Sequence, residues 1–167
     1  MKSRVLLLVL PVAMMLTACQ PATTELTDEQ KAAIEVEFKA FTEDVVSSVL
    51  DVDAEGFLNF FDNSADFTLV MGGSVFRSWQ SWAEMVRGNF SQLVTVESCD
   101  VSDEGVQVLA EDVVVYTADW VCSCTVTEDG PTMDLIDHTV TGVAVKRDGE
   151  WTIVNFTETV PQAASEG

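Results

Sequence analysis

The second half of the chain is dominated by four long strand-like segments, and this feature constrains the fold more than any other. They comprise residues 93–109, 113–126, 133–146 and 151–160. Short turn-forming stretches separate them, and the last of these, Asp148-Gly149, is the strongest hairpin signal in the chain. Because strands joined by tight turns pair antiparallel, we predict an antiparallel sheet here, with a bulge at Gly105.

Helical periodicity is confined to the first half of the chain. Thr27, with Gln30 three residues later, has the capping-box pattern that starts a helix. Apolar residues recur here at steps of three and four residues and form the predicted buried face of this helix. It comprises Ile34, Phe38, Phe41, Val45 and Val49. Asp53 is predicted to cap a short second helix that closes at Asn63.

A short hairpin and a third helix complete this half. Residues 65–71 and 74–76 have strand character and are joined by a pair of glycines. Ser78 is predicted to cap the third helix, and Gly88 is predicted to end it. Helices gathered in the first half and antiparallel strands in the second indicate an α+β domain.

The first eighteen residues have the features of an export signal. Lys2 and Arg4 precede a largely apolar run at 5–16, which is shorter than the roughly twenty residues of a bilayer span and matches a secretory signal. The run leads into Leu-Thr-Ala-Cys at 16–19, which resembles the lipobox of bacterial lipoproteins. The resemblance implies that Cys19 carries a lipid and becomes the N-terminus, and that Gln20 directs the protein to the outer membrane.

The chain is thereby divided into four parts. They are a signal peptide at 1–18, a lipidated tether at 19–26, one globular domain at 27–160 and a disordered tail at 161–167. The expected location is the outer membrane, facing the periplasm, or the cell surface. With 28 acidic against 8 basic residues and a net charge of −20, the chain lacks the basic surface that nucleic acid requires. We expect the protein to attach to the membrane through its lipid alone.

Three stretches share their order and character with one superfamily. A strand, glycine turn, strand and helix start lie at 66–73 and 76–79, and a last hairpin with the motif DG-x-W-x-I lies at 138–154. Together they resemble the NTF2-like superfamily and its SnoaL-like branch. The resemblance implies a curved antiparallel sheet wrapped round three helices, a cone with a pocket at its open end, and a cofactor-free homodimer. Such proteins include isomerases, dehydratases and cyclases as well as binding modules, so fold does not fix function.

Few residues could carry acid–base chemistry. His138 is the only histidine, so any histidine mechanism must use it. Asp119 and Asp137 lie within strands, where an aspartate is unfavourable unless it faces solvent or a polar cavity. Tyr116, the only tyrosine, is a candidate hydrogen-bond donor. These four residues are the catalytic candidates.

Aromatic residues are the predicted walls of the pocket. They include Phe60, Trp79, Trp82 and Trp120, together with Phe57, Phe61 and Phe156. Alternation along the last strand places Asn155 and Thr157 on the same face as Trp151 and Ile153, and so in the pocket. The resemblance implies a histidine or another polar residue near these two positions, and because Asn155 and Thr157 are uncharged, this departure argues against proton transfer at that end of the pocket.

Three cysteines lie within the predicted domain. The chain reverses between the first two long strands, at residues 110–112. If residues are paired outward from this reversal, Cys99 lies opposite Cys122 to Cys124. An oxidising compartment favours a disulfide from Cys99 to one of these two. The alternative is a zinc site built from the three cysteines and His138. The spacing of Cys122 and Cys124 is that of a strand and not of a C-x-x-C knuckle, so no metal is expected.

These observations lead to one functional prediction with two alternatives. The prediction is a lipid-anchored envelope protein that binds a small, largely apolar molecule. The alternatives are an isomerase, dehydratase or cyclase whose base is Asp119, Asp137 or His138, and an envelope assembly module. An ionisable residue that points into the cavity beside a hydrogen-bonding partner favours the enzyme. A large apolar patch on the outer face of the sheet favours assembly.

Overall fold

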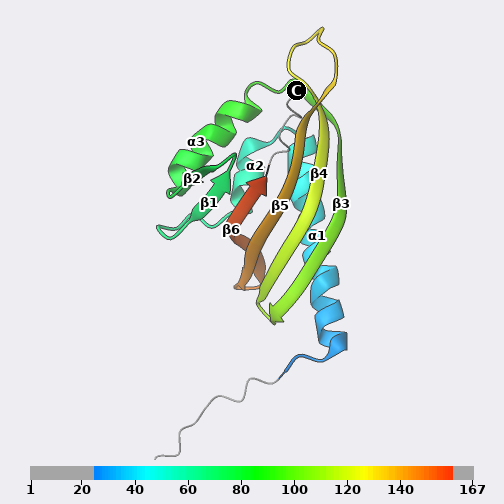
Figure 1. The fold of residues 1–167 in the computed structure, drawn as a ribbon, viewed down its shortest axis with the longest axis vertical. Coiled ribbons are helices and arrows are strands. Elements are labelled where there is room, and N and C mark those ends of the chain that lie inside the picture. The colour runs from blue at the N-terminus through cyan, green and yellow to red at the C-terminus, as the bar shows by residue number, and fades with distance from the viewer. Residues whose placement is uncertain (1–24, 160–167) are drawn as a thin grey trace, which may run out of the picture.

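The computed structural model describes residues 25–159, which form three helices and one six-stranded sheet (Figure 1). The predicted signal at 1–18, the lipidated Cys19 and the tail at 161–167 lie outside these residues, so those assignments stay predictions. None of the described helices is long and apolar enough to span a membrane.

The first helix begins and packs as its sequence predicts. The helices are α1 (Asp28–Leu50), α2 (Ala54–Asn59) and α3 (Trp79–Phe90). The capping box is present: Gln30 N donates to Thr27 Oγ1 over 3.2 Å and Thr27 N donates to Gln30 Oε1 over 2.9 Å. Phe38, Val45 and Val49 are buried on the predicted face of α1.

The second helix is capped by Asp53 as predicted, but it ends at Asn59, earlier than predicted. The backbone that follows α2 turns to pair with the sheet. Ile153 N donates to Phe60 O, and Asp62 N donates to Ile153 O, each over 2.9 Å. These two bonds satisfy backbone groups that a longer helix would have used itself.

The third helix is capped by Ser78 as predicted, but it passes through Gly88 and ends at Phe90. The predicted stop at Gly88 is therefore wrong. Gly88 does not adopt the left-handed backbone that ends helices. The additional residues bring Phe90 against Phe57, with ring centroids 5.5 Å apart, and this tertiary packing outweighs the low helix propensity of glycine.

The six strands form a mixed sheet. They are β1 (Thr68–Met71), β2 (Ser74–Phe76), β3 (Thr95–Ala110), β4 (Val113–Thr125), β5 (Met133–Arg147) and β6 (Glu150–Thr159). Their order is β2-β1-β6-β5-β4-β3. The four hairpin-linked pairs are antiparallel, whereas β1 runs parallel to β6. The prediction of a wholly antiparallel sheet is corrected at this pair, because no tight turn links β1 to β6 and fixes their relative direction.

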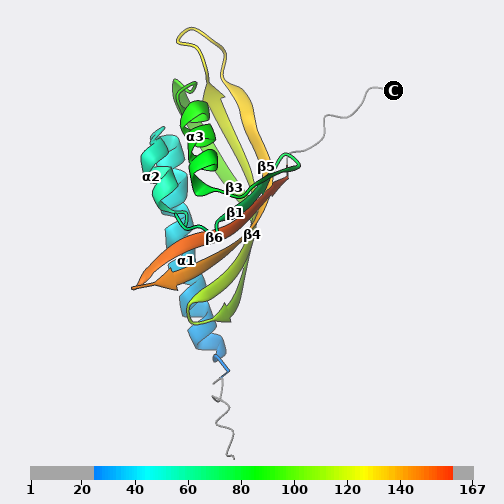
Figure 2. The ribbon, with the colours of Figure 1, turned by 90° about the vertical axis from the view of Figure 1, so that its left-hand side faces the viewer.

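The helices cover one face of the curved sheet. In Figure 2 all three helices lie on the same side of the strands, and in Figure 1 α1 runs along the long strands β3 and β4. The core lies between the two layers. Its largest fully buried side chains include Trp82, Phe38, Phe67, Leu58, Leu69 and Val114. The α+β fold with helices packed in a curved sheet is thus confirmed.

The β3–β4 hairpin confirms two predictions. Its register shifts between Ser102 and Gly105, where a bulge was expected. Cys99 lies opposite Cys122, and the two form a disulfide. Cys124, two residues further along β4, is buried.

The disulfide leaves the zinc alternative without its ligands. Cys99 and Cys122 are bonded to each other, and His138 lies opposite Trp120 rather than beside Cys122. Among residues 25–159, no group of three or more histidines, cysteines or carboxylates is placed to hold a metal ion.

Candidate functional site

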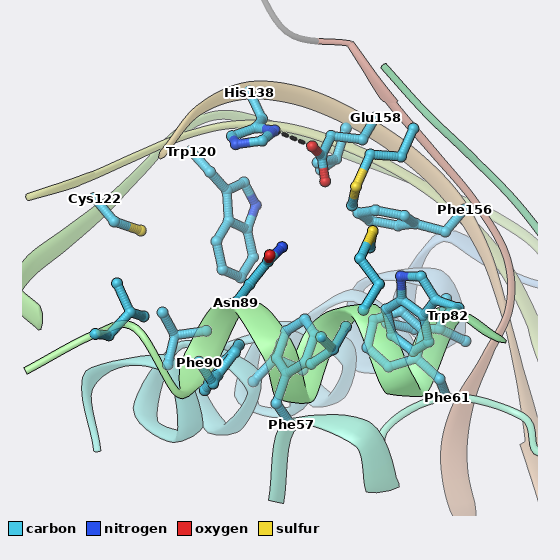
Figure 3. A pocket seen from close by; sticks show the side chains of 18 of the residues that line it. Phe57, Phe61, Trp82, Asn89, Phe90, Trp120, Cys122, His138, Phe156 and Glu158 are labelled. Atoms are coloured by element: carbon cyan, nitrogen blue, oxygen red, sulfur yellow. Dashed lines mark ion pairs between the residues drawn. The ribbon is translucent and has the colours of Figure 1, made fainter. Parts of the chain in front are cut away.

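A cavity of about 400 Å³ lies between the helices and the sheet, a size typical of small-molecule sites. Its wall is largely apolar and aromatic, with contributions from Phe57, Phe61, Trp82, Phe90 and Trp120 (Figure 3). The helices supply one side of this wall and the inner face of β4, β5 and β6 supplies the other. The predicted pocket is therefore present, and its chemistry depends on the few polar side chains that reach it.

Two titratable side chains meet in this wall. His138 of β5 and Glu158 of β6 both line the cavity. His138 Nδ1 is paired with Glu158 Oε1 (Figure 3), and the side chains are 17% and 9% exposed. A carboxylate facing Nδ1 favours the tautomer that carries its proton there, which leaves the Nε2 lone pair available. Nε2 makes no hydrogen bond to any of the described residues.

A bulge in β6 brings Glu158 into the cavity. The register between β5 and β6 shifts after the pair Ala144–Ile153, so that Val143 faces Asn155. The extra residue, Val154, reverses the alternation of the strand. Trp151 and Ile153 are buried before the bulge, and Phe156 and Glu158 line the cavity after it.

The same bulge corrects the prediction for Asn155 and Thr157. Neither residue lines the cavity. Asn155 lies in the strand opposite Val143, and its Nδ2 donates to Thr68 O over 3.2 Å. Glu158 was missed for the same reason, because an unbroken alternation sends it to the other face. The Asp148-Gly149 turn does give a partial indication that Glu158 and His138 lie close together. If residues are paired outward from this turn along the two strands, Glu158 falls within one residue of the position opposite His138.

The two aspartate candidates lie on the other face of the sheet. Trp120 and His138 are register partners whose side chains both line the cavity. The neighbouring pairs Asp119–Thr139 and Val121–Asp137 therefore point away from it. Asp119 Oδ1 accepts a hydrogen bond from Thr139 Oγ1 over 2.6 Å. The expectation that Asp119 or Asp137 supplies a base to the pocket is thus corrected, whereas His138 does reach it.

Tyr116 lies deep in the cavity wall. It is 6% exposed and packs against Phe38 with ring centroids 5.4 Å apart. A Cβ on Gly142 would lie 2.6 Å from the Tyr116 hydroxyl, so only glycine fits beneath the ring. Burial raises the pKa of Tyr116, because the phenolate would lose its hydration. The hydroxyl therefore stays protonated and is suited to donate a hydrogen bond, not to act as a base.

The predicted aromatic wall divides into two groups. Trp82 and Trp120 line the cavity, as do Phe57, Phe61 and Phe156. Phe60 and Trp79 do not. Phe60 caps the C-terminus of α2 and packs edge-on against Phe41. Trp79 lies under the guanidinium of Arg87, whose Cζ is 5.8 Å from the ring centroid.

Asn89 is a site residue that the sequence did not indicate. It lies one residue beyond the predicted end of α3, and its side chain points from the helix across the cavity toward Trp120 (Figure 3). The longer α3 fixes this direction. Asn89 and the His138–Glu158 pair therefore occupy opposite sides of the cavity.

The cavity wall contains few ionisable groups. Among the described residues that line it, His138 and Glu158 are the only acidic or basic side chains, and no lysine or arginine contributes. The indole nitrogens of Trp82 and Trp120 are buried without a hydrogen-bond acceptor. An unsatisfied buried donor costs about 1–3 kcal/mol, so an acceptor on a bound molecule would recover part of that cost.

Solved structures share the fold at low sequence identity. A putative scytalone dehydratase from Novosphingobium aromaticivorans matches with a TM-score of 0.70 and 11% identity, over 81% of this chain and 89% of that one. Hexachlorocyclohexane dehydrochlorinase LinA-type3 from Novosphingobium barchaimii gives 0.60 and 15%, over 83% and 96%. An NTF2-like superfamily protein from Salmonella enterica gives 0.63 and 16%, over 82% and 99%.

These likenesses confirm the NTF2-like fold that the sequence predicts. No protein-family model and no curated protein matches the chain. Identities of 11% to 16% show the fold alone, and function has to be argued from the cavity.

Proposed function

We propose that this NTF2-like domain binds a small, largely apolar molecule in its cavity and that His138 transfers a proton to or from it. The observation that carries the proposal is the pairing of His138 with the buried Glu158 in a wall that is largely apolar and, among the described residues, has no other acidic or basic side chain. An ionisable residue paired with a carboxylate inside the cavity favours the enzyme alternative.

The chemistry follows from the geometry of the pair. The Glu158 carboxylate, paired with His138 Nδ1, orients the imidazole, as a carboxylate does in other histidine-dependent sites. Nε2 then takes a proton from the bound molecule, and Glu158 stabilises the resulting imidazolium. The same Nε2 proton can be returned to another atom of the molecule or to its leaving group. This sequence suits isomerisation or elimination.

The structural neighbours agree with this reaction type. One is named a dehydratase and another a dehydrochlorinase, and both names denote elimination. The assembly alternative has less support, because the described outer face does not present an unbroken apolar patch: exposed Val121 lies among polar residues such as Asp119, Asp137 and Thr139. A homodimer stays a prediction.

The binding step can be tested by filling the cavity. Asn89 is exposed and points inward, so Asn89→Trp should occupy the space without disturbing the core. Native mass spectrometry of the purified protein should then show a retained small molecule on the wild type and at least tenfold less on the variant. Gln80→Trp, at an exposed position of α3 that does not line the cavity, is the matched control. Equal occupancy of both variants would contradict binding at this site.

We also propose that the domain is exported and anchored to the outer membrane through a lipid on Cys19. The support is the signal-like segment and the lipobox resemblance at 16–19. Cys19→Ala should abolish incorporation of a radiolabelled fatty acid and move the protein from the membrane to the soluble fraction, because one residue carries the whole anchor. Unchanged labelling in the variant would reject the assignment.

A further inference from the structure

The cavity selects against charged molecules. Among residues 25–159 no lysine or arginine lines it, and the Glu158 carboxylate lies in its wall, so a carboxylate or phosphate would meet repulsion without a compensating cation from these residues. A cationic ligand would have to displace His138 from Glu158. The ligand that fits is uncharged.

One wall of the cavity offers an unused hydrogen-bond donor. Trp120 Nε1 is buried and has no acceptor among the described residues. Trp120 lies opposite His138 in the sheet, and the nitrogen-bearing edge of its indole faces the interior and Glu158 (Figure 3). Indole is a donor only, so what satisfies it must be an acceptor.

The facing wall offers a second donor. The Asn89 side chain points from α3 toward Trp120 (Figure 3). Its amide makes no hydrogen bond within residues 25–159, and its NH₂ group can donate into the cavity. A carbonyl oxygen has two lone pairs and can accept from both walls at once, whereas a hydrocarbon can accept from neither.

We propose that Trp120 Nε1 and the Asn89 amide form an acceptor subsite, and that the cavity takes an uncharged aromatic or alicyclic carbonyl compound. The proposal rests on the proposed function, because it names the class of molecule that binds beside His138. The carbonyl oxygen lies between the two donors and the apolar body contacts the aromatic wall. Trp120 and Asn89 set specificity for the ligand.

Three probes of similar shape separate the contributions that the carbonyl oxygen, the apolar body and a negative charge make to the binding affinity. They are 2-acetylnaphthalene, 2-ethylnaphthalene and 2-naphthoate, each titrated calorimetrically into the purified protein at pH 8. The ketone should bind about fivefold more tightly than the hydrocarbon, which corresponds to one net hydrogen bond, and the carboxylate should show no binding. Equal affinity of ketone and hydrocarbon would overturn the subsite.

Two variants test whether Trp120 Nε1 and the Asn89 amide cause the difference in affinity between the ketone and the hydrocarbon. Trp120→Phe keeps an aromatic ring but removes the N–H, and Asn89→Asp keeps the shape but removes the donor. Each should reduce the preference for the ketone to about twofold or less while leaving the affinity for 2-ethylnaphthalene within twofold. Trp79→Phe is the control, because the Trp79 nitrogen is also buried without an acceptor but lies outside the cavity. An undiminished preference in both site variants would overturn the proposal.

The outcomes also separate this proposal from the one on which it rests. Binding of the hydrocarbon and the ketone with equal affinity leaves the apolar cavity intact and rejects the subsite alone. Binding of neither probe rejects both. Because Asn89 is exposed on α3, its variant should fold even if a change at Trp120 disturbs the sheet, and near-ultraviolet circular dichroism checks each variant.

Discussion

Replacing His138 with alanine is expected to slow proton abstraction in the cavity by about 100-fold, the lower end of what a positioned general base contributes. A suitable reporter is 5-nitrobenzisoxazole, which is uncharged and aromatic. When a base removes its C3 proton, the C–H electron pair forms a nitrile as the N–O bond breaks, and a coloured phenolate is released. The initial rate of phenolate formation is the measurement.

Two further variants distinguish the base from its surroundings. Glu158→Gln keeps the side-chain size but removes the negative charge beside Nδ1, and should slow the reaction about tenfold because the imidazolium loses its counter-charge. Asp137→Asn, on the other face of the sheet, should leave the rate unchanged. A His138→Ala variant that retains the wild-type rate would show that the reaction does not use the pair.

Loss of the Cys99–Cys122 disulfide is expected to produce the largest change in stability. The bond joins residues separated by 23 positions. A crosslink over a loop of this length stabilises by about 3 kcal/mol, chiefly by restricting the unfolded chain. Cys99 is the partly exposed partner on the edge strand β3, so Cys99→Ser removes the crosslink with little loss of packing. Chemical unfolding with and without reductant measures the effect.

The reductant supplies the internal control for this prediction. Wild-type protein should lose about 3 kcal/mol of unfolding free energy when reduced, whereas Cys99→Ser should start at the lower value and not respond to reductant. A wild-type protein whose unfolding is insensitive to reductant would contradict a stabilising role. Because Cys122 lines the cavity, ligand affinity should fall together with stability.

Features governed by local chemistry could be read from the sequence. The Thr27 capping box, the Asp148-Gly149 turn and the Cys99–Cys122 pairing each depend on residues that are close in sequence or linked by one hairpin. The side-chain pattern of such segments specifies their structure before the rest of the domain is known. Trp82 and Trp120 were placed correctly because they lie on the regular parts of α3 and β4.

The features that build the site depend on tertiary packing and could not be read in this way. The extension of α3 past Gly88 depends on Phe90 packing against Phe57, and it sets the direction of Asn89. The bulge at Val154 depends on the pairing of β6 with β5 and with the segment after α2, and it moves Glu158 into the cavity. Neither event leaves a distinct signal in the residues where it occurs.

The most direct test of the central claim, that the cavity is the ligand site, uses the indole N–H resonances of the four tryptophans. In a ¹⁵N-labelled sample titrated with 2-acetylnaphthalene, the Trp82 and Trp120 signals should shift saturably, because both rings line the cavity. The Trp79 signal should stay in place, because that ring lies under Arg87 outside it. Shifts at Trp79 alone, or at none of the four, would contradict the assignment of the cavity as the ligand site.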